Sequence, residues 1–165
     1  MRPLVRDAGD ADREAVRRIY NEGIADRIAT LDEELKTQAD IVAWFEAHTD
    51  RYAVLVVQDD AGAIVGWASL NPYSHRCAYR GVADLSIYVS RTARGCGIGS
   101  LLMEAIERRA RDNEFHKIVL FMLAFNEPAQ RLYRACGYRE VGIFHEQGRL
   151  DGAFVHVTAM EKILT

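Results

Sequence analysis

The residues best suited to ligand binding form a run of alternate glycines, Arg94-Gly95-Cys96-Gly97-Ile98-Gly99, between a strand-like stretch, residues 82–89, and a helix-like stretch, residues 100–111. Glycine lets the main chain come close to a ligand, and the amides that open a helix offer unpaired N–H donors at the positive end of the helix dipole. Such a turn suits an anion, above all the phosphate of a cofactor. The alternative is a sharp turn without a ligand. Arg94 is either a solvated charge or a further phosphate contact, and we favour the contact.

Two common nucleotide motifs do not fit this turn. A G-x-G-x-x-G fingerprint that starts at Gly95 needs glycine at position 100, where Ser100 stands, and the chain holds no P-loop Gly-Lys-Ser/Thr. Cys96 could be a nucleophile because helix N-termini favour thiolates, but no histidine or acid is placed to activate it. We expect Cys96 to be a small side chain tolerated in the turn, without a covalent intermediate.

Asp84 is a charged residue in the middle of the strand-like stretch. Strand alternation places it on one face with Ser86 and Tyr88, while the apolar residues between them point the other way. Asp84 therefore either lies on a wet face, pairs with an arginine, or acts as a general base that removes a proton from a substrate.

Tyr133 also has two interpretations. Its helical spacing with Ala129, Leu132 and Cys136 is typical of a core residue, yet a phenol can also donate a proton to a leaving group. The histidines are expected to be structural or on the surface, with the role of His156 open; they are His48, His116, His145 and His156.

Composition limits the possible partners. The chain has 165 residues, of which 49% are hydrophobic, enough for one domain over residues 1–165 with a substantial core. Its 21 basic and 24 acidic residues leave a net charge of −3, which disfavours nucleic acid as a partner. Three cysteines without metal-ligand spacing indicate a reducing cytoplasm and no metal site. No stretch approaches the ~20 apolar residues of a membrane span, so we expect no membrane partner.

Periodicity along the chain predicts seven strands and four helices. The expected strands cover residues 4–5, 53–58, 63–70, 82–89, 117–123, 138–146 and 154–160. The first helix is expected behind a cap at Asp10 and the second behind a cap at Thr37. The third covers residues 100–111, and the fourth runs from Asn126 to a left-handed stop at Gly137. This order of elements predicts an α/β protein with a mixed sheet and helices on its faces.

Two motifs give a family resemblance. The pattern Arg-x-x-Gly-x-Gly, residues 94–99, resembles the acyl-CoA-binding motif of the GNAT N-acetyltransferases. The segment from Asn126 to Tyr138 resembles the second signature of the same family, an Asn-led helix with a tyrosine ahead of Gly-Phe or Gly-Tyr. The resemblance implies the GNAT fold, with a central, mostly antiparallel twisted sheet flanked by helices, and it implies acetyl-CoA as cosubstrate.

A finer resemblance covers nearly the whole chain. It links the chain to the phosphinothricin, methionine sulfoximine and arsinothricin N-acetyltransferase group. The segments that carry it are Ile19-Tyr20-Asn21, Ala29-Thr30-Leu31 with Glu34, Trp44-Phe45, Arg76 with Ala78-Tyr79, and Asp84 to Val89. It implies a homodimer that transfers acetyl from acetyl-CoA to the α-amino group of a small amino-acid analogue, by direct attack in a ternary complex.

The resemblance also assigns site residues. Asp84 is the implied general base, and Tyr133 is the implied acid that protonates the departing CoA thiolate. A bulge implied near Tyr88 would free a main-chain N–H for the thioester carbonyl. The expected cofactor contacts are Ile87, Tyr88, Val89, Arg94, Gly95, Cys96, Gly97, Ile98, Gly99, Ser100 and Asn126. The expected acceptor contacts are Tyr73, Ser74, His75, Arg76, Tyr79, Asp84, Leu85 and Ser86, with the Arg76 guanidinium placed to grip a carboxylate or phosphinate.

Four departures from the group leave the acceptor open. Asp84 stands where many members have glutamate, and Leu35 replaces a proline after Glu34. Phe154 and His156 stand where tryptophan and aspartate are common. The alternatives are a protein N-terminal or lysine acetyltransferase and a non-catalytic CoA-binding module.

Overall fold

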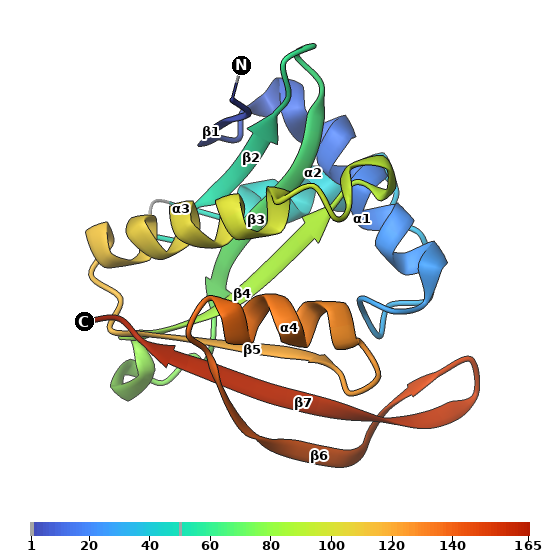
Figure 1. The fold of residues 1–165 in the computed structure, drawn as a ribbon, viewed down its shortest axis with the longest axis vertical. Coiled ribbons are helices and arrows are strands. Elements are labelled where there is room, and N and C mark those ends of the chain that lie inside the picture. The colour runs from blue at the N-terminus through green and yellow to red at the C-terminus, as the bar shows by residue number, and fades with distance from the viewer. Residues whose placement is uncertain (1, 50) are drawn as a thin grey trace.

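The computed structural model describes residues 2–49 and 51–165, and the strands in these residues form one twisted sheet in the order β1-β2-β3-β4-β5-β7-β6 (Figure 1). The strands are β1 (Leu4–Asp7), β2 (Val54–Gln58), β3 (Ile64–Pro72), β4 (Val82–Val89), β5 (Lys117–Leu123), β6 (Arg139–Leu150) and β7 (Ala153–Ile163). The helices are α1 (Arg13–Asp26), α2 (Gln38–Ala47), α3 (Ile98–Asp112) and α4 (Glu127–Ala135). Every strand pair is antiparallel except β4 with β5. The predicted order of elements and the predicted mixed sheet are confirmed.

Helices cover both faces of the sheet. In Figure 1, α3 lies in front of β2, β3 and β4, while α1 and α2 lie behind them. Strand β2 shows why, because its residues alternate between the two layers: Leu55 and Val57 are buried with Leu102 and Ile106 of α3, whereas Val56 is buried beneath α1 and α2. Burial of each such side chain stabilises the fold by roughly 1.5–3 kcal/mol.

Strands β4 and β5 separate soon after they start. They pair only through residues 82–84 of β4 and 117–119 of β5, although both strands continue further. Beyond that point β4 stays with β3 and β5 stays with β7, each in unbroken register. Figure 1 shows the two strands diverging towards the right, with α3 and α4 in front. This divergence leaves one edge of β4 without a neighbouring strand.

Three of the four predicted helix-end signals are correct, among them Asn126, whose Oδ1 accepts a hydrogen bond from Ala129 N (3.3 Å) at the start of α4. Thr37 caps α2: its Oγ1 accepts a hydrogen bond from Asp40 N (3.1 Å), and its own N–H donates to Asp40 Oδ2 (2.8 Å). Gly137 follows α4 with a left-handed φ of 91°. The predicted Asp10 cap is wrong, because a 3-10 turn over Asp10–Asp12 precedes α1 and no side chain caps the helix. Local signals thus set the ends of α2 and α4.

Both strands of the closing hairpin end later than predicted, at Leu150 and Ile163 and not at residues 146 and 160. Strand β6 continues to Leu150 through two register shifts against β7, one between Glu140 and Gly142 and one between Phe144 and Gly148. The predicted turn at Asp151-Gly152 is confirmed, with positive φ at both residues. Among the helices of the described residues, none is long and apolar enough to cross a bilayer.

Candidate functional site

The glycine turn opens α3 with unpaired amides. Gly95 and Gly97 have left-handed φ values of 74° and 81°, which glycine adopts without strain, and α3 begins directly after Gly97. The first backbone hydrogen bond of the helix runs from Leu101 N to Gly97 O (3.2 Å). The three preceding amides, residues 98–100, therefore have no partner within the helix and form a potential anion site.

This turn borders a cavity of about 500 Å³ that lies between β4, α3 and α4. Ten of the eleven residues expected to contact a cofactor line it: Ile87, Tyr88, Val89, Arg94, Gly95, Gly97, Ile98, Gly99, Ser100 and Asn126. Cys96 is not among the lining residues, and its Sγ faces Arg94 O at 3.6 Å. The exposed Cys96 side chain agrees with a tolerated small residue in the turn.

Several lining residues were not among the expected cofactor contacts. Ile28 and Ala29 reach the cavity from the segment after α1, while Phe121 and Met122 reach it from β5. Phe121 is 45% exposed although its strand reads as a continuous buried run. Only the divergence of β4 and β5 uncovers it, and that divergence is a property of the whole sheet.

The free edge of β4 presents main-chain donors to this cavity. Ser90 N donates to Val65 O of β3 (2.8 Å), so by strand alternation the N–H groups of Val89 and Ile87 point away from β3. Both residues line the cavity. The bulge expected near Tyr88 is absent from the β3–β4 register. Divergence from β5, not a bulge, frees these amides.

Arg94 contacts protein groups as well as the cavity. Its Nη1 lies 2.7 Å from Asp26 Oδ2, and its Nε donates to Val89 O at 3.3 Å. Arg91 also pairs with Asp26, at 2.8 Å. Hydrogen bonds from Arg91 and Arg94 hold the pKa of Asp26 below its usual value. The guanidinium of Arg94 is thereby held at the mouth of the glycine turn.

Asp84 lies on the same face of the sheet as Ser86 and Tyr88. It is paired across the strands with Asn71 of β3. Asn71 Nδ2 lies 3.4 Å from Asp84 Oδ2. Burial raises the pKa of the Asp84 carboxyl to about 6, against the opposing effect of hydrogen bonds from Asn71 and the main chain of Leu85. No arginine or lysine of the described residues forms an ion pair with Asp84. A carboxyl that titrates near neutral pH suits proton transfer.

Tyr133 combines the two roles considered for it. The residue is buried in the main core cluster and its side chain also lines the cavity. Burial raises the pKa of the Tyr133 phenol above its usual value, which keeps the hydroxyl protonated at neutral pH. A protonated hydroxyl at the cavity wall is a potential proton donor.

The segment expected to contact an acceptor lies at the surface. It leaves β3 directly after Asn71 and Pro72, at the end of the sheet where Asp84 lies. Tyr73 and Tyr79 pack edge to face with ring centroids 5.7 Å apart, and each is more than 40% exposed. The other loop residues in this set are Ser74, His75 and Arg76, of which His75 and Arg76 are exposed. Leu85 is buried in the core on the opposite face from Asp84 and Ser86, so its side chain points away from them.

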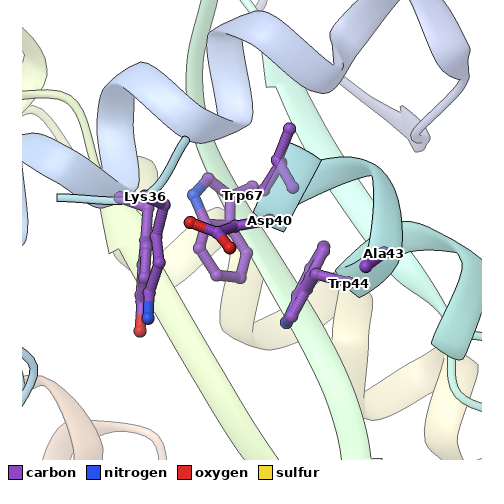
Figure 2. Close-up of a pocket in the computed structure, with 7 residues that line it drawn as sticks. Lys36, Asp40, Ala43, Trp44 and Trp67 are labelled. Carbon is purple, nitrogen blue, oxygen red and sulfur yellow. The ribbon is translucent and has the colours of Figure 1, made fainter. Parts of the chain in front are cut away.

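A second pocket, of about 450 Å³, lies beneath α2 on the face that carries Asp84. Figure 2 shows the ring of Trp67 between Lys36 and Trp44. The residues that line it are Tyr20, Lys36, Asp40, Ile41, Ala43, Trp44 and Trp67. Trp67 stacks on Tyr88 with ring centroids 4.9 Å apart, and Tyr20 meets Tyr88 edge to face at 4.9 Å. Tyr88, which lines the 500 Å³ cavity, therefore also contacts two residues of this aromatic pocket.

Comparisons with known proteins agree with this arrangement. Residues 14–138 match the family described as Acetyltransferase (GNAT) family. The L-methionine sulfoximine/L-methionine sulfone acetyltransferase of Pseudomonas paraeruginosa is 32% identical, with 98% of this chain and 94% of the relative covered.

Two solved structures have closely similar folds. One is a GNAT superfamily phosphinothricin acetyltransferase from Sinorhizobium meliloti in complex with AcCoA, with a TM-score of 0.94, 29% identity, and 99% of this chain and 89% of that chain covered. The other is a ribosomal-protein-alanine N-acetyltransferase from Brucella melitensis, with a TM-score of 0.94, 32% identity, and 98% and 99% covered.

Proposed function

Because the chain belongs to the acetyltransferase (GNAT) family, we propose that it transfers acetyl from acetyl-CoA to the α-amino group of a small amino-acid analogue. One observation carries this proposal: the unpaired amides of the glycine turn, the free edge of β4 and the Tyr133 side chain meet at one cavity of about 500 Å³. A phosphate-bearing thioester needs these three features, an anion site, donors for its carbonyl and a proton source for its thiolate.

The donor is proposed to lie along this cavity. The amides of residues 98–100 would bind the pyrophosphate of CoA, with the Arg94 guanidinium at the rim. The N–H groups of Ile87 and Val89 would contact the pantetheine arm and the thioester carbonyl. Apart from the Arg94 guanidinium, these hydrogen-bond donors belong to the main chain of β4 and of the turn that opens α3, which holds them in place before acetyl-CoA binds.

The chemistry is proposed to proceed by direct attack. Asp84, directly or through a water, takes a proton from the acceptor ammonium, and the freed nitrogen attacks the thioester carbonyl carbon. A C–N bond forms, the C–S bond breaks, and the sulfur leaves with the electron pair of that bond. Tyr133 gives its proton to the thiolate, the acylated nitrogen loses its second proton to the Tyr133 phenolate through solvent, and Asp84 then releases its proton to solvent. Asp84 titrates near neutral pH, which suits a base, and the Tyr133 hydroxyl still carries its proton at neutral pH.

The acceptor is proposed to bind on the Asp84 face of the sheet. The named relatives act on methionine sulfoximine and phosphinothricin, amino acids with a tetrahedral polar centre in the side chain. Arg76 and Tyr79 would contact that group, since their loop starts beside the Asn71–Asp84 pair. The aromatic pocket beside Tyr88 adds apolar surface and the Lys36 ammonium to the same region.

Transfer to a protein N-terminus is the second candidate, because one similar solved structure is a ribosomal-protein-alanine N-acetyltransferase. A thiol-release assay with acetyl-CoA separates the two. The acceptors should include phosphinothricin, methionine sulfoximine, ordinary amino acids and peptides that begin with alanine. We expect the fastest release with a free amino-acid analogue. Faster release with the peptides would support the second candidate. Acetyl-CoA binding without release for any amine would indicate a non-catalytic module.

We also propose that the protein is a cytoplasmic homodimer. Strand β6 forms one edge of the sheet, and its side chains Val141, Ile143 and Phe144 are each at least 46% exposed. Phe154 of the neighbouring β7 is 59% exposed. An edge strand with exposed apolar residues is normally covered by another chain or element. The three free cysteines suit a reducing compartment. Sedimentation velocity tests the dimer, and the substitution Phe144→Asp should shift it to monomer.

A further inference from the structure

A chain of polar side chains connects α2 to Asp84. His48, at the end of α2, has its Nδ1 2.7 Å from Trp44 O and its Nε2 2.8 Å from Asn71 Oδ1. Asn71 Nδ2 then lies 3.0 Å from Ser86 Oγ and 3.4 Å from Asp84 Oδ2. The amide of Asn71 is thus the bridge between the imidazole and the carboxylate.

The donors and acceptors of this chain fix the charge of the imidazole. Trp44 O is a carbonyl and can only accept, so His48 Nδ1 must carry a proton. Asn71 Oδ1 can also only accept, so His48 Nε2 must carry a proton as well. Ser69 Oγ also donates to Asn71 Oδ1, at 3.0 Å. With the amide in this orientation both imidazole nitrogens donate, as in an imidazolium, and the NH₂ group of Asn71 faces the Asp84 carboxylate.

If the Asn71 side-chain amide were rotated by half a turn, both His48 and Asp84 would be neutral. After a half-turn about its last side-chain bond, Asn71 would present NH₂ to His48 and oxygen to Asp84. His48 Nε2 would then have to accept and the imidazole would be neutral, while Asp84 would need a proton to donate to that oxygen. The protonation states of His48 and Asp84 are therefore coupled: one orientation of the Asn71 amide requires a charged imidazolium and a carboxylate, and the other requires a neutral imidazole and a neutral carboxyl.

In the part of the chain that the structure describes, no other charged group near these side chains takes the place of the His48–Asn71–Asp84 hydrogen bonds. His48 borders a cavity of about 180 Å³ that also contains Asp7, Tyr52 and Arg109, and Asp7 and Arg109 pair with each other at 3.0 Å. On the other side, the ionisable groups that interact with Asp84 are Tyr88 and Tyr133. Burial raises the pKa of both phenols, so neither is charged at neutral pH. The imidazolium is the cation that the hydrogen bonds connect to Asp84.

We propose that His48 is a positioning residue which, through Asn71, orients Asp84 and holds its carboxylate in the anionic form that can accept a proton. This inference rests on the proposed function, in which Asp84 is the base. His48 does not take the substrate proton. The N–H bond of the ammonium breaks, an O–H bond forms on Asp84, and the electron pair stays on nitrogen, while the protons of His48 remain in place.

The first test is the pH dependence of kcat/KM in His48→Gln. Glutamine can still form hydrogen bonds but carries no charge, so the acid limb of the profile should move to higher pH. A shift of one unit corresponds to about a tenfold loss on the acid side and little loss on the alkaline side. KM for acetyl-CoA should stay unchanged. The matched control is His116→Gln, an exposed residue beside β5, which should keep the wild-type profile. A His48→Gln profile that superimposes on the wild-type profile would overturn the proposal.

The second test asks whether the effect passes through Asn71. In an Asn71→Ala background, His48→Gln should cause no further shift of the acid limb, because the bridge is already lost. Additive shifts would show that His48 acts by another route and would contradict the proposal.

A third measurement needs no turnover and no variant of His48. Nitrogen NMR of the imidazole rings should show protons on both nitrogens of His48 near neutral pH, and the change Asp84→Asn should alter the titration of His48 but not that of His116. An unaltered His48 titration would overturn the inference. Failure of every amine to release thiol would overturn the proposed function instead, so the two failures are distinguishable.

Discussion

Gly99 of α3 lies directly against Leu132 of α4: a Cβ on Gly99 would stand 2.9 Å from Leu132 Cδ2. Both residues line the 500 Å³ cavity, so this contact sets how closely the two helices flank it. Gly99 has no left-handed φ, and closeness of approach alone requires glycine there.

The first prediction follows from this contact. Gly99→Ala should push the Leu132 side chain into the cavity and raise KM for acetyl-CoA roughly threefold to tenfold, with a cost of about 1–3 kcal/mol for overpacking. The double variant Gly99→Ala with Leu132→Ala should regain much of the lost affinity, because the space is restored. A double variant that binds acetyl-CoA more weakly than either single one would show that this contact does not shape the cavity.

Gly97 tests the turn itself. Its φ of 81° is strained for any other residue, so Gly97→Ala should cost about 1–2 kcal/mol and disturb the amides that open α3. Acetyl-CoA affinity, measured by calorimetry, should fall at least severalfold. Gly62→Ala is the matched control, because Gly62 has a φ of 86° in the β2–β3 hairpin and lies outside the cavity. It should lose similar stability and keep the affinity; equal affinity losses in both variants would remove the turn from donor binding.

The Asp84 carboxyl should lower the free energy of unfolding at pH values at which it is ionised. Its pKa is raised by burial to about 6 in the folded chain, so the folded state gains stability below the unfolded pKa of about 4 and loses it as the pH rises through 6. Asp84→Asn should therefore be more stable than wild type by about 1–3 kcal/mol near pH 8, and the difference should shrink towards pH 4. Urea denaturation at several pH values measures this. A pH-independent difference would contradict the burial of an ionisable carboxyl.

Tyr133 should matter for turnover more than for binding. Tyr133→Phe keeps the ring in the core and removes the proton, so kcat should fall by about 10²-fold while KM for acetyl-CoA changes little. Tyr138→Phe is the control, since Tyr138 is buried in the same cluster with its ring 6.2 Å from that of Tyr133 but does not line the cavity. Similar kcat values for the two variants would leave Tyr133 as a core residue only.

Much of the scaffold could be predicted from local patterns. The predicted bounds of β4 and β5 are those of the structure, because alternation and a continuous apolar run are properties of adjacent residues. The Thr37 cap and the Gly137 stop were predictable for the same reason. The glycine turn could be located because the conformations it needs are nearly exclusive to glycine.

The two errors have different physical causes. Asp10 does not cap α1, and Asp12 beside it is held by the Arg6 guanidinium at 2.7 Å and 3.0 Å. The expected bulge near Tyr88 is replaced by the divergence of β4 from β5, which depends on what each strand pairs with on its other edge. No local pattern contains that information.

The aromatic pocket and the His48 link were not predicted from the sequence. Tyr20, Trp44 and Trp67 come from three elements, and each reads by its spacing as an ordinary core residue. His48 and Asn71 are 23 positions apart, and only the packing of α2 on β3 brings them together. Such sites depend on tertiary structure even when every element is predicted correctly.

The central claim is that Asp84 serves as the base for acetyl transfer from acetyl-CoA, and the rate of thiol release by wild type and Asp84→Ala across pH tests it most directly. Methionine sulfoximine is the first acceptor to use. Alkaline solution itself deprotonates the acceptor, so the account predicts a large loss of turnover near neutral pH, on the order of 10²-fold or more, and a smaller loss at alkaline pH. A negligible loss that is equal at every pH would contradict it.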